Sequence, residues 1–432
     1  MSLRTAVKKV IPKKLFRTVE PYGHLVEASA INTVNGFPAR GMKVIGVTGT
    51  NGKTSTCFLI HRMLTEAGYK VGLMTTVAYG VGDDIKPQIH HMTNVSVPEL
   101  MQRLKMMKKA GIDWLVLETT SHALAQHRVW GVPYSVAVMT NVTHEHLDYH
   151  GTFKRYLDAK LRLFKLANKN KHGLKVGVIN ADDANAASFA KVIKNPLLYG
   201  VDKGDLRASN VRLTAQGCKY NVELADETLH ITCNLPGSFN VSNSLAAVGV
   251  GGIIGLTKDE IEKGIAALKS VEGRMNTIDE GQNFQVIVDY AHTPDSFEKL
   301  FKDLKPVIKG KFIVLFGSAG RRDEAKRAVQ GELAGKYADE VVITEEDDRD
   351  IDGLEIMNQI AEGAEKAGKE RDKNLFLVHD RTEAIGFAIN RATAGDTVLL
   401  LGKGHEKTIE RADGEHPWDE IGTARKALKK TL

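Results

Sequence analysis

The sequence predicts an α/β protein: a P-loop ATPase unit with a mostly parallel sheet and a small antiparallel insert, followed by a second, Rossmann-like α/β unit. A glycine loop, Thr-Gly-Thr-Asn-Gly-Lys-Thr, occupies residues 48–54 directly after the apolar run 44–47. Short apolar runs alternate with helical segments along most of the chain, which is typical of parallel sheets covered by helices. From 206 to 235 apolar and polar residues alternate, which predicts antiparallel strands.

The remaining elements follow in chain order. We expect strands at residues 44–47, 71–74, 114–117, 136–139, 176–179, 286–288, 312–316, 341–343, 375–378 and 398–401. Helical spacing predicts helices at 55–64, 156–164 and 258–268. A boundary near Ser270 then gives a short N-terminal segment at 1–42, a central ATP-binding domain at 43–270 and a C-terminal domain at 271–432. Glycine loops follow two of the later strands, at 317–320 and 402–404, and ligands bind at such strand ends. We therefore expect a cleft between the two domains.

Composition narrows the classes of function. The chain has 432 residues, 42% hydrophobic and 26% charged, as in ordinary globular proteins. Its net charge of +6, from 59 basic and 53 acidic residues, is too balanced for a nucleic-acid-binding surface. The longest apolar stretch, 245–256, is too short to cross a bilayer, which needs ~20 residues. We expect a cytoplasmic monomer, with oligomers left open, that takes small-molecule substrates and binds neither nucleic acid nor membranes.

The cysteines support a reducing compartment. Cys57, Cys218 and Cys233 are scattered along the sequence and odd in number. This pattern excludes a disulfide framework and a Cys-x-x-Cys metal site.

The glycine loop predicts a binding site for a nucleoside triphosphate. Gly49 and Gly52 let backbone N–H groups close around phosphate oxygens, Lys53 places a charge on the β and γ phosphates, and Thr54 offers a hydroxyl to Mg²⁺. The first glycine of the general P-loop pattern falls on Val47, and the alternative is a plain glycine turn with a solvated lysine. The strand, loop and helix context favours ATP. The expected contacts are Gly49, Thr50, Asn51, Gly52, Lys53, Thr54 and Ser55.

Further candidates stand at other strand ends. Glu118, after the strand 114–117, can hold the Mg²⁺ of a P-loop enzyme, or it is a carboxylate at a helix N-terminus. Three histidines lie within 141–150 but supply no tetrahedral zinc set; Mg²⁺ with one imidazole and a solvated loop are the two alternatives. By helical pattern alone Lys160 is an exposed lysine. Arg274 and Asp289 could hold a nucleotide, although surface ion pairs are the commoner role.

Together these segments resemble the Mur ligase family, most closely its MurE-type members. The resemblance rests on ordered motifs: residues 49–54, Ser121-His122-Ala123-Leu124 with Gln126 and Arg128, Thr140-Asn141, 146–151, Ala159-Lys160, 180–183, 235–237 with Phe239-Asn240 and Asn243, 273–275, 289–294 and 402–406. It implies an ATP-dependent, ADP-forming amide ligase. Such an enzyme adds an amino acid to a UDP-N-acetylmuramoyl-dipeptide through an acyl phosphate, in peptidoglycan precursor synthesis.

The resemblance also implies roles for single residues. Lys53 would neutralise phosphate charge, Thr54 and Glu118 would hold one Mg²⁺, and His146 would lie in the shell of a second. Lys160 matches a lysine that the family carbamylates into a metal ligand. The matches for binding the adenine, ribose and phosphates of ATP are Asn243, Arg274, Asp289 and His292.

Three departures concern the substrates. About forty residues precede the P-loop strand, whereas a UDP-binding domain needs on the order of a hundred. In Met92-Thr93-Asn94-Val95, Thr93 matches the segment that contacts the sugar nucleotide, and Thr120, Gln126 and Arg128 fit the acceptor site. Glu346-Asp347-Asp348-Arg349 replaces Asp-Asn-Pro-Arg: Arg349 suits a carboxylate and Asp347 a cationic amine, which favours a diamino acid. Gly402 and Glu406 are shared too widely within the family to indicate whether the diamino acid is diaminopimelate, lysine or ornithine.

Two other readings stay open. One is a related ligase of the cyanophycin or folylpolyglutamate type that acts without a UDP-sugar, which the short N-terminus favours. The other is a non-catalytic ATP-binding scaffold, which the retention of Lys53, Glu118, His146 and Lys160 argues against.

Overall fold

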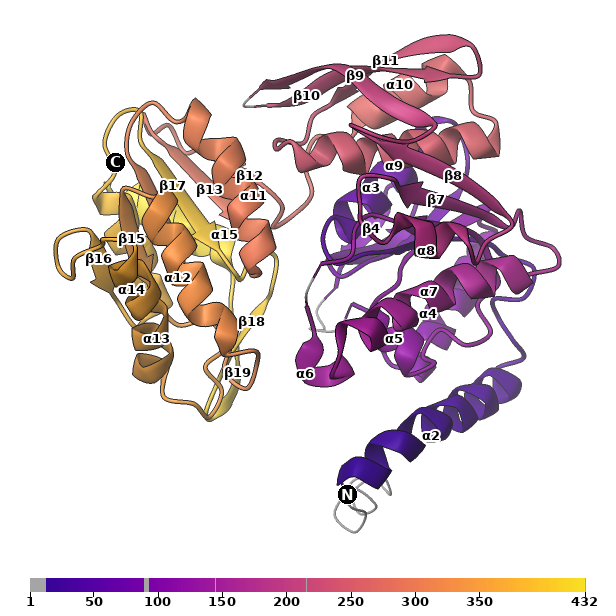
Figure 1. Ribbon diagram of the computed structural model, residues 1–432, viewed down its shortest axis with the longest axis horizontal. Helices are drawn as coiled ribbons and strands as arrows, with labels where there is room; N and C mark the ends of the chain where they lie inside the picture. The colour runs from indigo at the N-terminus through magenta and orange to yellow at the C-terminus, as the bar shows by residue number, and fades with distance from the viewer. Residues whose placement is uncertain (1–12, 89–92, 144, 215, 432) are drawn as a thin grey trace.

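The computed structural model describes residues 13–88, 93–143, 145–214 and 216–431, with side chains from Tyr22 onward except that of Asp148. Two sheets lie side by side, each covered by helices, and α2 (Lys13–Val34) projects from the N-terminal half (Figure 1). The larger sheet has eleven strands and the smaller has six. The predicted α/β fold with a second Rossmann-like unit is confirmed.

The larger sheet forms the first unit, in the order β11-β10-β9-β8-β7-β6-β1-β5-β2-β3-β4. Its strands are β1 Lys43–Thr48, β2 Val71–Met74, β3 Ala78–Val81, β4 Asp84–Pro87, β5 Trp114–Glu118, β6 Tyr134–Met139, β7 Val176–Asn180, β8 Asn195–Gly200, β9 Leu206–Thr214, β10 Gly217–Leu224 and β11 Glu227–Cys233. The middle strands are parallel, and β9, β10 and β11 form the expected antiparallel insert. This insert extends the same sheet at one edge (Figure 1).

The smaller sheet forms the second unit, in the order β12-β13-β17-β14-β15-β16. Its strands are β12 Asn276–Ile278, β13 Gln285–Asp289, β14 Phe312–Phe316, β15 Glu340–Ile343, β16 Leu375–Leu377 and β17 Thr397–Leu401. A separate hairpin follows, with strands β18 Thr408–Arg411 and β19 Gly414–Pro417. The five strands expected here are confirmed, whereas β12 and the hairpin were missed.

Helices cover both faces of each sheet. They are α3 Lys53–Glu66, α4 Val97–Ala110, α5 Ser121–Ala125, α6 Leu147–His150, α7 Phe153–Lys169, α8 Ala186–Ala190, α9 Phe239–Ile254, α10 Lys258–Ala267, α11 Pro294–Leu304, the short 3-10 helix η1 Lys305–Val307, α12 Ala325–Tyr337, α13 Gly353–Lys366, α14 Arg381–Asn390 and α15 Glu420–Thr431. In the first unit α3, α9 and α10 pack on one core cluster, and α4, α5 and α7 on the other. No helix in the described part of the chain is long and apolar enough to cross a membrane.

The two units meet directly. Phe239, at the start of α9, packs against the core cluster of the second unit. Next to it, the backbone N–H of Ser238 donates to Asp303 of α11 at 2.6 Å. One edge of the interface therefore contains an apolar contact.

A buried histidine on α3 predicts how stability depends on pH. His61 is 4% exposed, and burial lowers its pKa from 6.5 to about 4. Because the unfolded chain binds the proton more readily, stability is full above pH 6.5 and is lost as the pH falls toward 4. Between pH 6.5 and 4 the unfolding free energy of His61→Gln should fall by about 3 kcal/mol less than that of the wild type. Urea denaturation at a series of pH values measures both. His172→Gln, at an exposed site, is the control; equal slopes for wild type and His61→Gln would contradict the prediction.

Candidate active site

The P-loop joins β1 to α3 and needs glycine at two positions. A Cβ on Gly49 would lie 1.9 Å from Oγ1 of Thr140, and one on Gly52 would lie 2.3 Å from Oδ1 of Asn243. Gly52 also has φ 81°, a left-handed conformation that favours glycine. The loop therefore lies tightly against its neighbours, in the close turn that a phosphate cradle requires.

Residues at the carboxyl end of β6 fix the shape of this loop. Thr140 donates to the carbonyl oxygen of Asn51 at 2.6 Å, and the N–H of Asn51 donates to Oδ1 of Asn141 at 2.9 Å. The hydroxyls of Thr50 and Tyr156 lie 2.9 Å apart. The side chain of Thr50 thus holds the loop to α7.

Thr54 and Glu118 are brought together, as expected for two ligands of one cation. The register of β1 and β5 pairs Val47 with Glu118, so both P-loop and carboxylate stand at the same sheet edge. Thr54 donates to the Glu118 carboxylate at 3.0 Å, and Thr76 donates to it through its N–H and its hydroxyl. Glu118 is 1% exposed. A carboxylate and a hydroxyl are oxygen ligands that Mg²⁺ accepts, so the residues fit the ion.

Two lysines converge on the P-loop. Nζ of Lys53 donates to the carbonyl of Thr50 at 2.6 Å, and Nζ of Lys160 donates to the carbonyl of Gly49 at 2.5 Å. Lys160 is 2% exposed, so the interpretation from helical pattern alone, an exposed lysine, is wrong. Burial, with the charge of Lys53, holds the pKa of Lys160 well below its usual value. The amine is therefore much more readily neutral, and hence nucleophilic, than a solvated lysine.

His146 lies at the edge of this site in a left-handed conformation, with φ 56°. Its ring contacts that of His122, and its Nε2 lies 3.5 Å from the carboxylate of Glu145. Burial lowers the pKa of His146, against the effect of Glu145. His144 lies outside the described residues.

Glu145 links the two units. Its carboxylate lies 3.3 Å from Nε2 of His292, and the other ring nitrogen of His292 lies 2.8 Å from the carbonyl of Tyr290. Burial alone would raise the pKa of Glu145, but His146 and His292 hold it below its usual value.

The second unit brings further predicted residues to the P-loop. Arg274 donates to Oγ1 of Thr54 at 3.3 Å and stacks over the ring of Tyr290. Asn51 donates to Asp295 at 2.9 Å. Asp289 stabilises the backbone next to Arg274, because its carboxylate accepts from the backbone N–H of Met275 at 2.8 Å. Burial raises the pKa of Asp289.

Two of the predicted acceptor residues, Thr120 and Arg128, contact an asparagine that the sequence interpretation did not assign to the site. Asn94 donates to the carbonyl of Glu118 at 2.7 Å and accepts from the N–H and hydroxyl of Thr120 at 2.9 Å. Arg128 donates to the carbonyl of Asn94 at 2.9 Å. The hydroxyl of Thr76 donates to the hydroxyl of Thr93 at 2.8 Å. The buried amide oxygen of Gln126 has no partner within the described residues, so it remains available as an acceptor.

Asn94→Ala should therefore destabilise the protein. The substitution leaves the carbonyl of Glu118 and the N–H of Thr120 without partners in a buried position, which costs about 1–3 kcal/mol. Urea unfolding measures the difference. Asn283→Ala, on an exposed loop, should change the unfolding free energy little, and an equal loss in both variants would contradict the assignment.

The predicted amino-acid-binding residues contact partners within the second unit. Arg349 pairs with Glu410 of β18 at 2.7 Å and donates to the carbonyl of Gly320. Gly402 has φ 102°, and a Cβ there would meet the carboxylate of Glu346. Burial raises the pKa of Glu346.

Glu406 belongs to a buried polar network. Lys403, fully buried, pairs with Glu406 at 2.5 Å and with Asp347 at 2.8 Å. The hydroxyl of Tyr290 donates to Glu406 at 3.1 Å. Asp347 is thus neutralised by a lysine within the protein.

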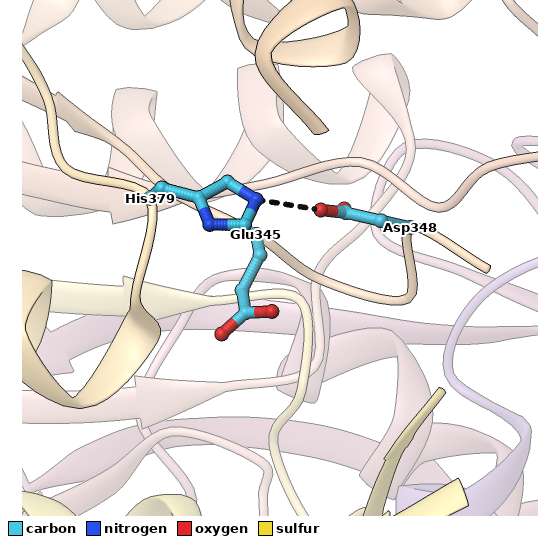
Figure 2. A group of neighbouring side chains, drawn as sticks. All are labelled: Glu345, Asp348 and His379. Atoms are coloured by element: carbon cyan, nitrogen blue, oxygen red, sulfur yellow. Dashed lines mark hydrogen bonds and ion pairs between the residues drawn. The ribbon is translucent and has the colours of Figure 1, made fainter. Parts of the chain in front are cut away.

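Glu345, Asp348 and His379 form a group with metal-ligand spacing among the described residues, with donor atoms within 4.8 Å of one another. Figure 2 shows His379 facing Asp348, while the carboxylate of Glu345 points away from that pair. Arg411 donates two bonds to Glu345. Ion pairing within the protein therefore accounts for this acidic group.

The structure adds residues that carried no signal of their own in the sequence. Thr76 and Asn94 hold Glu118 and Thr120, and Glu145 links two histidines. Burial is the main cause that lowers the pKa of His122 to about 3, and the charge of Arg322, from the loop after β14, lowers it further. Arg322 therefore places positive charge of the second unit near the predicted acceptor site.

Comparisons with known proteins identify the family of this chain. Residues 47–251 match the family model of the Mur ligase middle domain, and residues 273–404 match that of the Mur ligase glutamate ligase domain. A UDP-N-acetylmuramyl-tripeptide synthetase of Roseiflexus sp. (strain RS-1) is 42% identical over 405 residues, covering 91% of this chain and 80% of the relative.

Solved structures give the same picture. A UDP-N-acetylmuramoyl-L-alanyl-D-glutamate–2,6-diaminopimelate ligase is 31% identical, with a TM-score of 0.62 over 90% of this chain and 78% of the other. The folylpolyglutamate synthase of Mycobacterium tuberculosis, solved with ADP and AMPPCP, has a TM-score of 0.70 at 16% identity, covering 88% and 92% of the two chains. This second likeness shows the fold alone. Mur ligases are ATP-dependent amide ligases, and this chain belongs to the Mur ligase family.

Proposed function

We propose that this protein joins an amino acid to a UDP-N-acetylmuramoyl-dipeptide acceptor in an ATP-dependent, ADP-forming reaction of peptidoglycan precursor synthesis. The observation that carries the proposal is the convergence of Thr54, Glu118 and Lys160 on one P-loop. Relatives named for tripeptide synthesis support the acceptor.

The chain's own groups would bind and orient the reactants. Backbone N–H groups of the P-loop hold phosphate oxygens, and Lys53 and Arg274 add positive charge where charge develops during phosphoryl transfer. Bound ATP would supply the phosphoryl group that activates the acceptor carboxylate, and Mg²⁺ held by Thr54 and Glu118 would screen the phosphate charge. The incoming amine then attacks the activated carboxyl group, and phosphate leaves. Asn243, Asp289 and His292 would hold the nucleoside from the side of α9 and the second unit.

Thr54, Glu118, His146 and Lys160 are the proposed metal residues. The depressed pKa of Lys160 supports its carbamylation, because an unprotonated amine adds to CO₂ and releases one proton. The product is a carboxylate, an oxygen ligand suited to Mg²⁺.

Thr93, Thr120, Gln126 and Arg128 are proposed to bind the acceptor. Arg349, Gly402 and Glu406 are proposed to bind the incoming amino acid. Arg349 is paired with Glu410, so a substrate carboxylate would have to exchange with that ion pair. We propose a diamino acid as the incoming substrate, which relatives named as 2,6-diaminopimelate ligases support. We further propose that the enzyme acts as a cytoplasmic monomer.

The test is ADP release with purified protein, Mg²⁺, ATP and UDP-N-acetylmuramoyl-dipeptide. Lysine, ornithine, diaminopimelate and alanine are compared as amines. We expect ADP formation that requires both the acceptor and a diamino acid. Turnover with folate or free peptide acceptors alone would replace the proposal with a ligase that acts without a UDP-sugar. ATP binding without ADP formation from any acceptor would favour a scaffold.

A further inference from the structure

Two of the three cysteines face each other across a hairpin. The antiparallel register of β10 and β11 pairs Cys218 directly with Cys233, at the end opposite the turn Ala225-Asp226. Directly opposed residues have Cβ atoms about 4.5–5.5 Å apart, and a disulfide needs about 3.5–4.5 Å. Cysteines that are scattered in the sequence are therefore in contact in the fold, and a small movement would join them.

Both thiols point to the same side of the sheet. Cys218 and Cys233 are each 1% exposed and belong to one core cluster, which also contains Tyr220 of the same face. Strand β11 is at the edge of the eleven-stranded sheet. Edge strands and hairpin ends open locally more easily than central strands, which gives a small oxidant a path to the pair.

Each of the two thiols is the main influence on the pKa of the other. This mutual effect agrees with two sulfur atoms that lie side by side, so whichever thiol is oxidised first has its partner next to it.

We propose that Cys218 and Cys233 are an oxidisable dithiol that hydrogen peroxide converts into a cross-strand disulfide. The sulfur of one thiol attacks a peroxide oxygen, the O–O bond breaks, one water leaves, and a sulfenic acid is formed. The sulfur of the second thiol then attacks the sulfenic acid sulfur, the S–S bond forms, the S–O bond breaks, and a second water leaves. Two thiols and one peroxide thus give one disulfide and two waters.

Cys57 serves as an internal control. It lies on α3, fully buried, and burial is the main cause that raises its pKa. It has no thiol opposite it, since the other two cysteines pair with each other. It should therefore stay reduced under conditions that oxidise the pair.

Peptide mapping of the full chain tests the proposal. Trypsin cleaves after Lys53, Arg62, Arg212, Lys219 and Lys258, so the cysteines fall on separate peptides: 54–62, 213–219 and 220–258. After treatment with hydrogen peroxide and alkylation in denaturant, we expect peptides 213–219 and 220–258 to be linked and Cys57 to be alkylated. The intact protein should lose two hydrogen masses, and dithiothreitol should restore it.

Variants sharpen the result. Cys218→Ser and Cys233→Ser should lose the linked peptide, whereas Cys57→Ala should retain it. If a serine variant fails to fold, the wild-type time course decides, because Cys218 and Cys233 must lose alkylation in parallel. Three alkylated thiols after peroxide, separate sulfinic or sulfonic acids on the two cysteines, or a disulfide between two chains would each overturn the proposal.

Discussion

Lys160→Ala is expected to lower ADP formation by at least about 10³-fold, because it removes several kcal/mol of metal-centred stabilisation and each ~1.4 kcal/mol is tenfold in rate. The side chain is buried beside the P-loop, where Nζ reaches the carbonyl of Gly49. Short carboxylic acids should partly restore activity, since they supply the lost carboxylate in the space that the side chain vacates. ADP release is measured against the concentration of acetate or formate.

Two comparisons make this result specific. Lys165→Ala changes an exposed lysine of the same helix and should retain wild-type activity without any response to acetate. Carbon-13 NMR of the wild type in labelled bicarbonate should show a carbamate signal that the Lys160→Ala protein lacks. Wild-type turnover in Lys160→Ala would exclude a catalytic role for this lysine.

Glu118→Gln is expected to raise the Mg²⁺ concentration needed for half-maximal ADP formation by about 10²-fold or more. The substitution keeps the shape of the side chain and removes its charge. Glu118 is almost fully buried and accepts from Thr54 and Thr76, so no solvent ion replaces that charge. ADP formation is titrated with MgCl₂ at saturating ATP.

Glu362→Gln, on the exposed face of α13, is the matched control and should leave the Mg²⁺ titration unchanged. Thermal unfolding of Glu118→Gln verifies that the variant is folded. An unaltered Mg²⁺ dependence in folded Glu118→Gln would remove this carboxylate from the proposed metal site.

The parallel strands were predictable because buried strands read as uninterrupted apolar runs. All five residues of β14, Phe312–Phe316, are buried. The missed strands carry no such run. β8, Asn195–Gly200, begins with an asparagine and a proline, and β19, Gly414–Pro417, contains glycine, proline and charge. Their pairing depends on neighbouring strands, which a local pattern does not contain.

The part of the site that lies at the carboxyl ends of strands could be predicted from the sequence. Glu118 and the P-loop follow neighbouring parallel strands, so adjacency in the sheet brings them together. The burial of Lys160 was not predictable from its helix, because the partner that receives its amine is Gly49, on a distant segment. Asn94 and Glu145 gave no signal either, since a single amide or carboxylate in a loop shows its role only through what surrounds it.

The interface between the two units contains polar links in one place and an apolar contact in another, and the two respond differently to water. At the P-loop edge the links are polar: Asn51 to Asp295, Arg274 to Thr54 and Glu145 to His292. When water or a bound ligand replaces such a bond, the free energy of the protein changes by only about 0.5–1.5 kcal/mol for each bond. Elsewhere in the interface Phe239 packs, partly buried, against the apolar core of the second unit, and separating that contact would expose apolar surface to water. Water or a nucleotide can therefore enter the interface at the P-loop at a lower cost in free energy than at Phe239.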